Sequence, residues 1–221
     1  ERERLSRLKN TPAVTLDGQT IELLANIEQP SDAVAALKAG AVGVGLFRSE
    51  FLFMGRNGRL PDEQEQYLAY RAAVEGMQGL PVTIRTVDVG ADKPLDRGAS
   101  RSGDDHLNPA LGLRAIRWSL ADPSMFLTQL RAILRAAAHG KVNLLIPMLA
   151  HGSEIRQTLA LIDQAESEAV AMSSNLFRVH GELSDAERKA RLAEYESGTA
   201  QVVVTVAVLT EGYDFTPTSC V

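Results

Sequence analysis

Apolar runs of strand length alternate with amphipathic stretches of helix length along most of this chain. The apolar runs lie at residues 21–27, 43–47, 82–89, 142–149, 176–180 and 201–209. The stretches with helical patterning lie at residues 31–40, 62–77, 110–120, 123–138, 153–165 and 184–195. Strands that alternate with helices are typical of a parallel sheet built from strand–helix units. The pattern therefore predicts an α/β fold.

Two of the predicted helices have clear boundary residues. Ser31 is placed as the N-cap of the first helix, and Gly40 is placed to end it. Asp122 is placed as the N-cap of the helix over 123–138, with Pro123 in its first turn. These local signals support the helical interpretation of both segments.

Charged and polar side chains gather where the predicted strands end. Functional residues in strand–helix barrels sit at the C-terminal ends of the strands. A guanidinium group offers paired donors in one plane, which suits phosphate and carboxylate groups. The pattern predicts an anion site, and its candidate residues are Asn26, Arg48, Arg85, Asp88, Lys93 and Arg114.

A structural role for these arginines stays open at this point, because an arginine near a strand end is commonly solvated or paired with a carboxylate. Arg85 fits solvation less well, since it lies between the apolar residues Ile84 and Val87. A partly buried cation at that position needs an anionic partner.

Composition narrows the cellular setting. The 221 residues carry a formal net charge of −5 and a pI of about 5.5, so nucleic acid is not an expected partner. Cys220 is the single cysteine, which favours a reducing compartment. No apolar run approaches the length of a membrane span, and no signal peptide is evident. We expect a cytoplasmic protein without membrane contact.

Several motifs in residues 1–166 match a known family in order along the chain. They are IELLANI, GVGLFRSEFLFMGR, TIRTVDVGADKP, NPALGLRAIR and QLRAILRAAAHGKVNLLIPML. These motifs resemble the phosphoenolpyruvate-binding barrel of Enzyme I, the phosphoenolpyruvate–protein phosphotransferase of the bacterial sugar phosphotransferase system. The resemblance covers the first four of the family's eight strand–helix units, and it implies half of a (β/α)8 barrel.

The resemblance implies roles for individual residues. Arg48 and Arg85 match arginines that hold the phosphate of phosphoenolpyruvate, and Arg114 matches a further active-site arginine. Asp88 and Lys93 match the polar loop after the third strand, where this chain has GADK in place of the family's GGDK. In the family the barrel binds phosphoenolpyruvate with magnesium, and the phosphoryl group passes to a histidine on a separate domain.

Other family motifs are absent from this sequence. The acidic magnesium ligands lie in motifs resembling MVET and NDLTQY, and neither motif occurs here. Cys220 lies in no motif that matches the family's catalytic cysteine, and the histidine-bearing domain has no counterpart. Because phosphoryl transfer depends on metal and cations together, we expect weak binding of phosphoenolpyruvate or a phosphate-like anion without turnover, and no bound Mg²⁺ is expected.

The last part of the chain resembles a different family. The motifs VHGELSDAER and VVVTVAVLTEGYDFTPTSCV are similar to the second RecA-like domain of superfamily 2 helicases. That resemblance implies a weak nucleotide site at Gly212 and Asp214. No phosphate-binding loop of the pattern Gly-x-x-x-x-Gly-Lys-Ser/Thr is present, so a strand–helix–strand unit that extends a sheet is the simpler interpretation.

These resemblances divide the chain into a lead-in over 1–20, a half-barrel over 21–166, a join over 167–174 and a RecA-like piece over 175–221. A chimera is the resulting prediction. Three functions stay open, namely an anion-binding module derived from a phosphotransferase, a folded protein without inherited activity, and a fragment of a nucleic-acid-dependent ATPase. Open strand edges also make a homo-oligomer possible.

Overall fold

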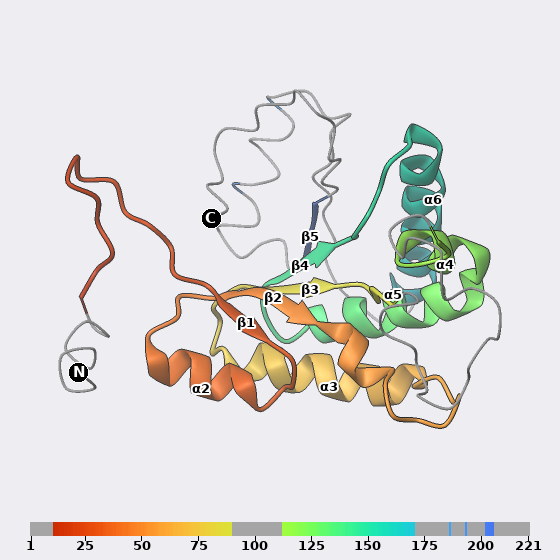
Figure 1. Ribbon diagram of the computed structural model, residues 1–221, viewed down its shortest axis with the longest axis horizontal. Coiled ribbons are helices and arrows are strands. Elements are labelled where there is room, and N and C mark those ends of the chain that lie inside the picture. Colours follow the sequence, from red (N-terminus) through yellow and green to blue (C-terminus); the bar gives the residue numbers. More distant parts are fainter. Residues whose placement is uncertain (1–10, 90–111, 171–185, 187–192, 194–201, 206–221) are drawn as a thin grey trace.

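The core of the protein is a parallel β-sheet. The computed structural model describes residues 11–89, 112–170, 186, 193 and 202–205 (Figure 1). Five strands lie side by side in chain order, β1-β2-β3-β4-β5, and every neighbouring pair is parallel. Their bounds are Ala25–Ile27, Val44–Arg48, Val82–Arg85, Val142–Leu145 and Val202–Thr205. The predicted α/β class is confirmed, and β1 to β4 are compatible with half of a barrel.

The strands are shorter than the apolar runs that predicted them. β1 begins at Ala25 rather than at residue 21, although the Leu23 carbonyl still accepts a hydrogen bond from Val42 N at 3.0 Å. β4 ends at Leu145, two residues before Pro147. Proline has no N–H to donate to a strand ladder, so the sheet cannot continue through it. Ile146 and Leu149 lie beyond the end of β4 and are buried, so their apolar character reflects packing rather than membership of the ladder.

The helices connect successive strands. Their bounds are α2 Asp32–Ala39, α3 Glu63–Gly76, α4 Ile116–Ala121, α5 Pro123–Ala137 and α6 Gly152–Val170, with a short 3₁₀ helix η1 at Ser49–Leu52. Figure 1 shows α2 and α3 side by side beneath the sheet. α3 packs against α5, and α5 packs against α6. Among the helices that the structure describes, none combines the length and apolar character needed to cross a bilayer.

Helix ends agree in part with the sequence signals. Gly40 ends α2 with φ of 94°, a left-handed geometry that costs glycine little. Asp122 caps α5, since its Oδ1 accepts a hydrogen bond from Met125 N at 3.1 Å. Ser31 holds the N-cap position of α2, but its side chain makes no capping bond. Asp32, the first residue of α2, instead holds the preceding loop, since its Oδ2 accepts a hydrogen bond from Gln29 N at 2.9 Å.

The main hydrophobic core lies between the sheet and the helices. On β3, Val82 and Ile84 are buried, whereas Thr83 and Arg85 are partly exposed. Phe47 of β2 meets Tyr70 of α3 edge to face, with ring centroids 5.8 Å apart. Successive side chains of β3 point to opposite faces of the sheet, so Arg85 points to the face away from this core. The candidate site is built on that face.

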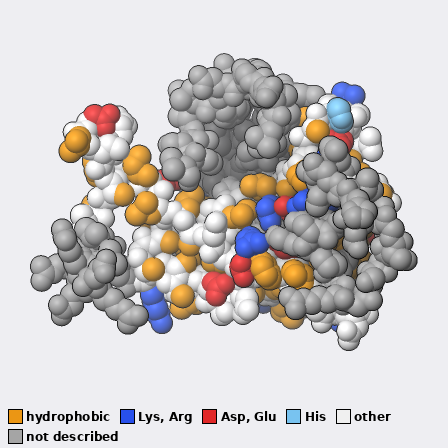
Figure 2. All heavy atoms as spheres, viewed as in Figure 1, with side chains coloured by type: hydrophobic (Ala, Val, Ile, Leu, Met, Phe, Trp, Pro, Cys, Tyr) orange, Lys and Arg blue, Asp and Glu red, His pale blue; other side chains and the backbone are white. Residues whose placement is uncertain are grey.

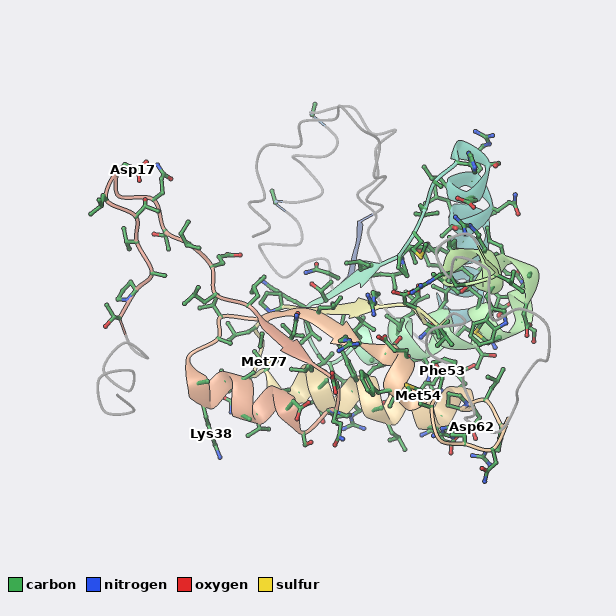
Figure 3. All side chains as sticks on the ribbon, viewed as in Figure 1. Asp17, Lys38, Phe53, Met54, Asp62 and Met77 are labelled. Atoms are coloured by element: carbon green, nitrogen blue, oxygen red, sulfur yellow. The ribbon has the colours of Figure 1, made fainter. Side chains whose placement is uncertain are left out.

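The segment before β1 extends away from the sheet. Val14 and Thr20 form an isolated antiparallel bridge, and Asp17 lies at the tip of the turn between them (Figure 3). Leu16 is fully exposed, and Leu23 and Leu24 are also exposed. This arm therefore adds little to the buried core.

The C-terminal part of the chain contributes β5, which lies within the predicted strand at 201–209. Val202 of β5 pairs in parallel register with Val142 of β4. The predicted strand at 176–180 lies outside the described residues, while Ala186 and Ala193 are helical. α6 continues to Val170, so helix occupies the first part of the predicted join at 167–174. The division of the chain at this join stays a prediction.

Candidate functional site

The ends of β2 and β3 bring the predicted arginines together. Arg48 is the last residue of β2, Arg85 is the last residue of β3, and the two are register partners in the sheet. Asp88 lies three residues beyond Arg85, and Arg114 lies just before α4. Four of the predicted site residues therefore share one edge of the sheet, as the position of strand ends in a parallel sheet requires.

An alternating series of charges joins these residues. Arg48 Nε lies 3.3 Å from Glu50 Oε1, and Arg85 Nη2 lies 2.7 Å from the same oxygen. Arg85 Nη1 contacts Asp88 Oδ2 at 3.1 Å, and Arg114 Nη2 donates to Asp88 Oδ1 at 2.9 Å. Figure 2 shows basic and acidic side chains intermixed at the centre of the viewed face. Each guanidinium is thus held in one orientation by a carboxylate.

Glu50 is the residue of this series that sequence reasoning missed. Its side chain is fully buried, whereas those of Arg85 and Arg114 are 16% and 14% exposed. A buried carboxylate is costly unless cations and hydrogen bonds surround it. The sequence held a partial signal, because Glu50 directly precedes the apolar residues Phe51, Leu52 and Phe53.

The outer end of the series is more open to solvent. Arg48 Nη1 contacts Glu28 Oε1 at 2.7 Å, and the Glu28 side chain is 48% exposed. The Arg48 guanidinium also lies over the ring of Phe51, 4.9 Å from its centroid. Glu28 is the second acidic residue that the sequence did not identify. A solvent-exposed ion pair of this kind contributes little stability and exchanges readily.

The backbone next to Arg114 has an unusual conformation. Ala115 has φ of 47° and ψ of −127°, and it is fully buried. Its N–H donates to the Val89 carbonyl at 3.3 Å. A residue with a side chain rarely adopts positive φ, and such strain concentrates at functional sites. The conformation directs Arg114 back toward Asp88.

The remaining predicted residues do not join this cluster. Asn26 lies in β1, exposed, with Leu46 of β2 as its register partner. Lys93 lies outside the described residues, as do Gly212 and Asp214 of the predicted nucleotide site. The cluster that the structure supports therefore consists of Arg48, Arg85, Asp88 and Arg114 with the two added carboxylates; we call it the arginine cluster.

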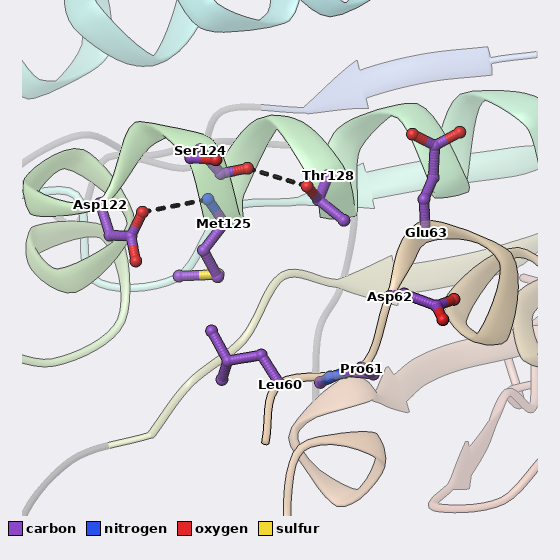
Figure 4. Close-up of a pocket in the computed structure, with 8 residues that line it drawn as sticks. All are labelled: Leu60, Pro61, Asp62, Glu63, Asp122, Ser124, Met125 and Thr128. Carbon is purple, nitrogen blue, oxygen red and sulfur yellow. Dashed lines mark hydrogen bonds between the residues drawn. The ribbon is translucent and has the colours of Figure 1, made fainter. Parts of the chain in front are cut away.

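A separate hollow of about 370 Å³ lies where α3 and α5 begin (Figure 4). Its rim includes the carboxylates of Asp62, Glu63 and Asp122, above apolar groups of Leu60 and Met125. None of the arginines of the cluster lines it. Its acidic rim disfavours phosphate, so the hollow is not the candidate anion site.

Metal binding finds no support in the arginine cluster. Within the described ranges, no group of three His, Cys, Asp or Glu side chains could hold a metal ion. The carboxylates of Glu50 and Asp88 are engaged by guanidinium groups. Both carboxylates therefore serve as partners of the arginines in this structure.

Known proteins match most of this chain. Residues 2–178 match the family "PEP-utilising enzyme, PEP-binding domain". A phosphoenolpyruvate-protein phosphotransferase of Cupriavidus necator is 68% identical over 171 residues, which cover 76% of this chain and 28% of that protein. Proteins of the same name from Staphylococcus carnosus and Staphylococcus epidermidis are 43% and 42% identical, over 74% and 84% of this chain.

The aligned regions cover 28% to 30% of the length of these relatives. The family match ends at residue 178, so the helicase-like interpretation of residues 175–221 and the chimera stay predictions. The matched residues include β1 to β4 and the arginine cluster, and this chain therefore belongs to the PEP-utilising enzymes and corresponds to their PEP-binding domain.

Proposed function

We propose that this chain binds phosphoenolpyruvate at the arginine cluster. The observation that carries the proposal is the convergence of Arg48 and Arg85, at adjacent strand ends, on one oxygen of the buried Glu50. Two guanidinium groups that are fixed side by side form a ready receptor for a phosphate group. The match to a PEP-binding domain supports the same ligand.

The inner part of the cluster supplies preorganised charge. Arg85 and Arg114 are largely buried, and Asp88 holds both of them. Their side chains do not have to be ordered when an anion arrives, so little conformational entropy is lost on binding. Arg114 is then available as a third cation for the carboxylate group of phosphoenolpyruvate.

At the outer part of the cluster, an incoming phosphate can replace a carboxylate. Arg48 is tied to Glu28 by an exposed ion pair, and a phosphate can replace that carboxylate. In this exchange, Arg48 loses a single contact with the exposed Glu28 carboxylate, which carries one negative charge. It gains a contact with an oxyanion that carries two negative charges. Binding of phosphoenolpyruvate is therefore expected to open the contact between Arg48 and Glu28.

The similar proteins are named phosphoenolpyruvate-protein phosphotransferases, and this similarity alone links the chain to a phosphotransferase reaction. We infer that this chain supplies part of a PEP-binding barrel to such a reaction, with β1 to β4 as its first half. The described residues hold and orient the substrate's anionic groups. We therefore assign them binding and orientation of the anion.

Calorimetric titration with phosphoenolpyruvate tests the proposal. Arg48→Ala and Arg85→Ala are each expected to weaken binding by roughly tenfold or more, since a hydrogen bond to a charged group contributes about 1.5 to 3 kcal/mol. Arg71→Ala serves as the matched control, because Arg71 lies on α3 in an exposed pair with Glu75. Titrations with and without Mg²⁺ separate a metal requirement from binding by the arginines.

Two results would contradict the proposal. One is a folded wild-type chain that takes up no phosphoenolpyruvate at millimolar concentration, with or without Mg²⁺. The other is binding that Arg48→Ala and Arg71→Ala weaken equally, which would indicate general charge attraction rather than a defined site.

A further inference from the structure

Gln129 lies on α5, directly behind the arginine cluster. Its side chain is completely buried. The amide makes three hydrogen bonds to three different segments of the chain, which are the residue after β2, the residues after β3, and α3. A buried amide with its donors and acceptor all engaged holds the elements that it connects in one relative position.

One bond reaches the end of β2. Gln129 Nε2 donates to Ser49 Oγ at 3.1 Å, and Ser49 is the residue directly after Arg48. The Ser49 hydroxyl in turn donates to the Arg85 carbonyl at 2.5 Å. Through Ser49, the amide therefore fixes the separation between the two strand ends that carry the cluster's arginines.

A second bond reaches the chain after β3. Gln129 Oε1 accepts from Val87 N at 3.0 Å. The ladder with β4 ends just before this residue, since Thr86 N still donates to the Leu145 carbonyl at 2.9 Å. Gln129 satisfies the first buried N–H beyond the ladder and so places Asp88, the carboxylate that joins Arg85 to Arg114.

The third bond anchors the amide. Gln129 Nε2 donates to Tyr70 OH at 2.9 Å, and Tyr70 OH donates to Gln66 Oε1 at 3.1 Å. Gln66 Nε2 donates to the Pro61 carbonyl at 3.0 Å. Burial raises the pKa of Tyr70 far above its usual value, so this hydroxyl stays neutral and keeps its donor. The direction of every bond in the series is fixed by these partners.

We propose that Gln129 is a positioning residue of the arginine cluster, which sets the spacing of Arg48 and Arg85 and the placement of Asp88 through Ser49 and Val87. The inference rests on the proposed binding of phosphoenolpyruvate. Gln129 itself contacts the backbone and hydroxyl groups behind the cluster and is not a ligand of the anion. Its effect on binding passes through the geometry of the guanidinium groups.

The experiment compares Gln129→Leu with Ile133→Ala in the full chain. Both positions are buried on α5, but Ile133 contributes only apolar packing. We expect Gln129→Leu to weaken phosphoenolpyruvate binding by roughly tenfold, because a small displacement of a binding group carries a large penalty. Ile133→Ala is expected to lower the melting temperature and leave the affinity within about twofold of wild type.

A spectroscopic signature separates positioning from stability. The side-chain Nε–H resonances of Arg48 and Arg85 report the hydrogen bonding of their guanidinium groups. We expect Gln129→Leu to shift these resonances in the free protein and Ile133→Ala to leave them in place. Should the leucine variant fail to fold, Gln129→Glu replaces it, since its protonated carboxyl keeps the acceptor for Val87 N and one of the two donors of the amide. Its affinity relative to wild type is then expected to fall as the pH rises.

The outcomes distinguish this inference from the proposed function. A wild-type chain that binds no phosphoenolpyruvate contradicts the proposed function, and the arginine resonances still decide the role of Gln129. Equal loss of affinity in Gln129→Leu and Ile133→Ala overturns the inference, as do arginine resonances that the Gln129 variants leave unmoved. Loss of affinity and shifted resonances in the Gln129 variants alone support it.

Discussion

Arg48 and Arg85 occupy matching register positions at the ends of β2 and β3, and both contact Oε1 of Glu50. A register pair brings two cations to neighbouring strand ends, where they would repel each other without a shared anion. Glu50 supplies that anion from the 3₁₀ turn that follows β2. The arrangement links the parallel topology directly to the proposed anion site.

Removal of the Glu50 charge is expected to destabilise the protein. Glu50→Gln leaves the partly buried Arg85 with Asp88 as its remaining carboxylate, so we expect a loss of about 1 to 3 kcal/mol in the free energy of unfolding. Urea denaturation of the variant and the wild type measures this loss. Unchanged stability would show that Arg85 finds a compensating partner or solvent.

Removal of the Glu28 charge is expected to tighten anion binding. Glu28 is the exposed partner of Arg48 and competes with the phosphate for it. Because such a pair contributes about 0 to 1 kcal/mol, we expect Glu28→Gln to improve phosphoenolpyruvate affinity by up to about fivefold. Glu22→Gln is the matched control, since Glu22 is an exposed carboxylate on the same segment. Equal effects of both variants would point to net charge alone.

The contacts of Glu63 are expected to make stability depend on pH. Burial alone would raise the pKa of Glu63, but hydrogen bonds from Arg131 and Arg135 outweigh it and hold the pKa below the usual value. A lowered folded-state pKa stabilises the protein above the unfolded value, here 4.5, and the contribution disappears as the pH falls through the folded value.

Double-mutant cycles between Glu63→Gln and Arg131→Met measure this contribution. We expect a coupling of about 0.5 to 1 kcal/mol at pH 7, because both side chains are partly exposed. The coupling should fall as the pH is lowered below 4.5, because Glu63 then becomes protonated. A coupling that does not fall once Glu63 is protonated would show that a neutral hydrogen bond, rather than the charge, joins the helices.

Close packing around Gly43, just before β2, predicts that an added methyl group destabilises the protein. A Cβ at Gly43 would lie 2.9 Å from Leu24 Cδ2 and 3.0 Å from the Pro81 carbonyl oxygen. We expect Gly43→Ala to lower the free energy of unfolding by about 1 to 3 kcal/mol. Gly152→Ala is the control, since the nearest atom would be 3.5 Å away in a flexible arginine and alanine favours the helix. Thermal unfolding of both variants distinguishes the two outcomes.

The position of the candidate site was predictable in part. Arg48 directly follows its apolar run, and parallel strands place their ends on one edge of a sheet. Arg85 lies inside the strand predicted over 82–89, and only the structure ends β3 at this residue. The partners of these arginines were not predictable in the same way. Glu50 appeared in the sequence as one charge in an aromatic segment, with no local sign of which cations it would meet.

The sequence by itself determined the alternation of strands and helices, the end of α2 at Gly40 and the cap of α5 at Asp122, because hydrophobic period and capping act within a few residues. Only the tertiary structure decided which buried groups contact one another behind the arginine cluster. Gln129 meets Ser49 across 80 residues of chain and Val87 across 42. Such contacts depend on how α5 packs behind the sheet, and the physical reason is that a buried polar group takes its partners from whichever elements the fold places beside it.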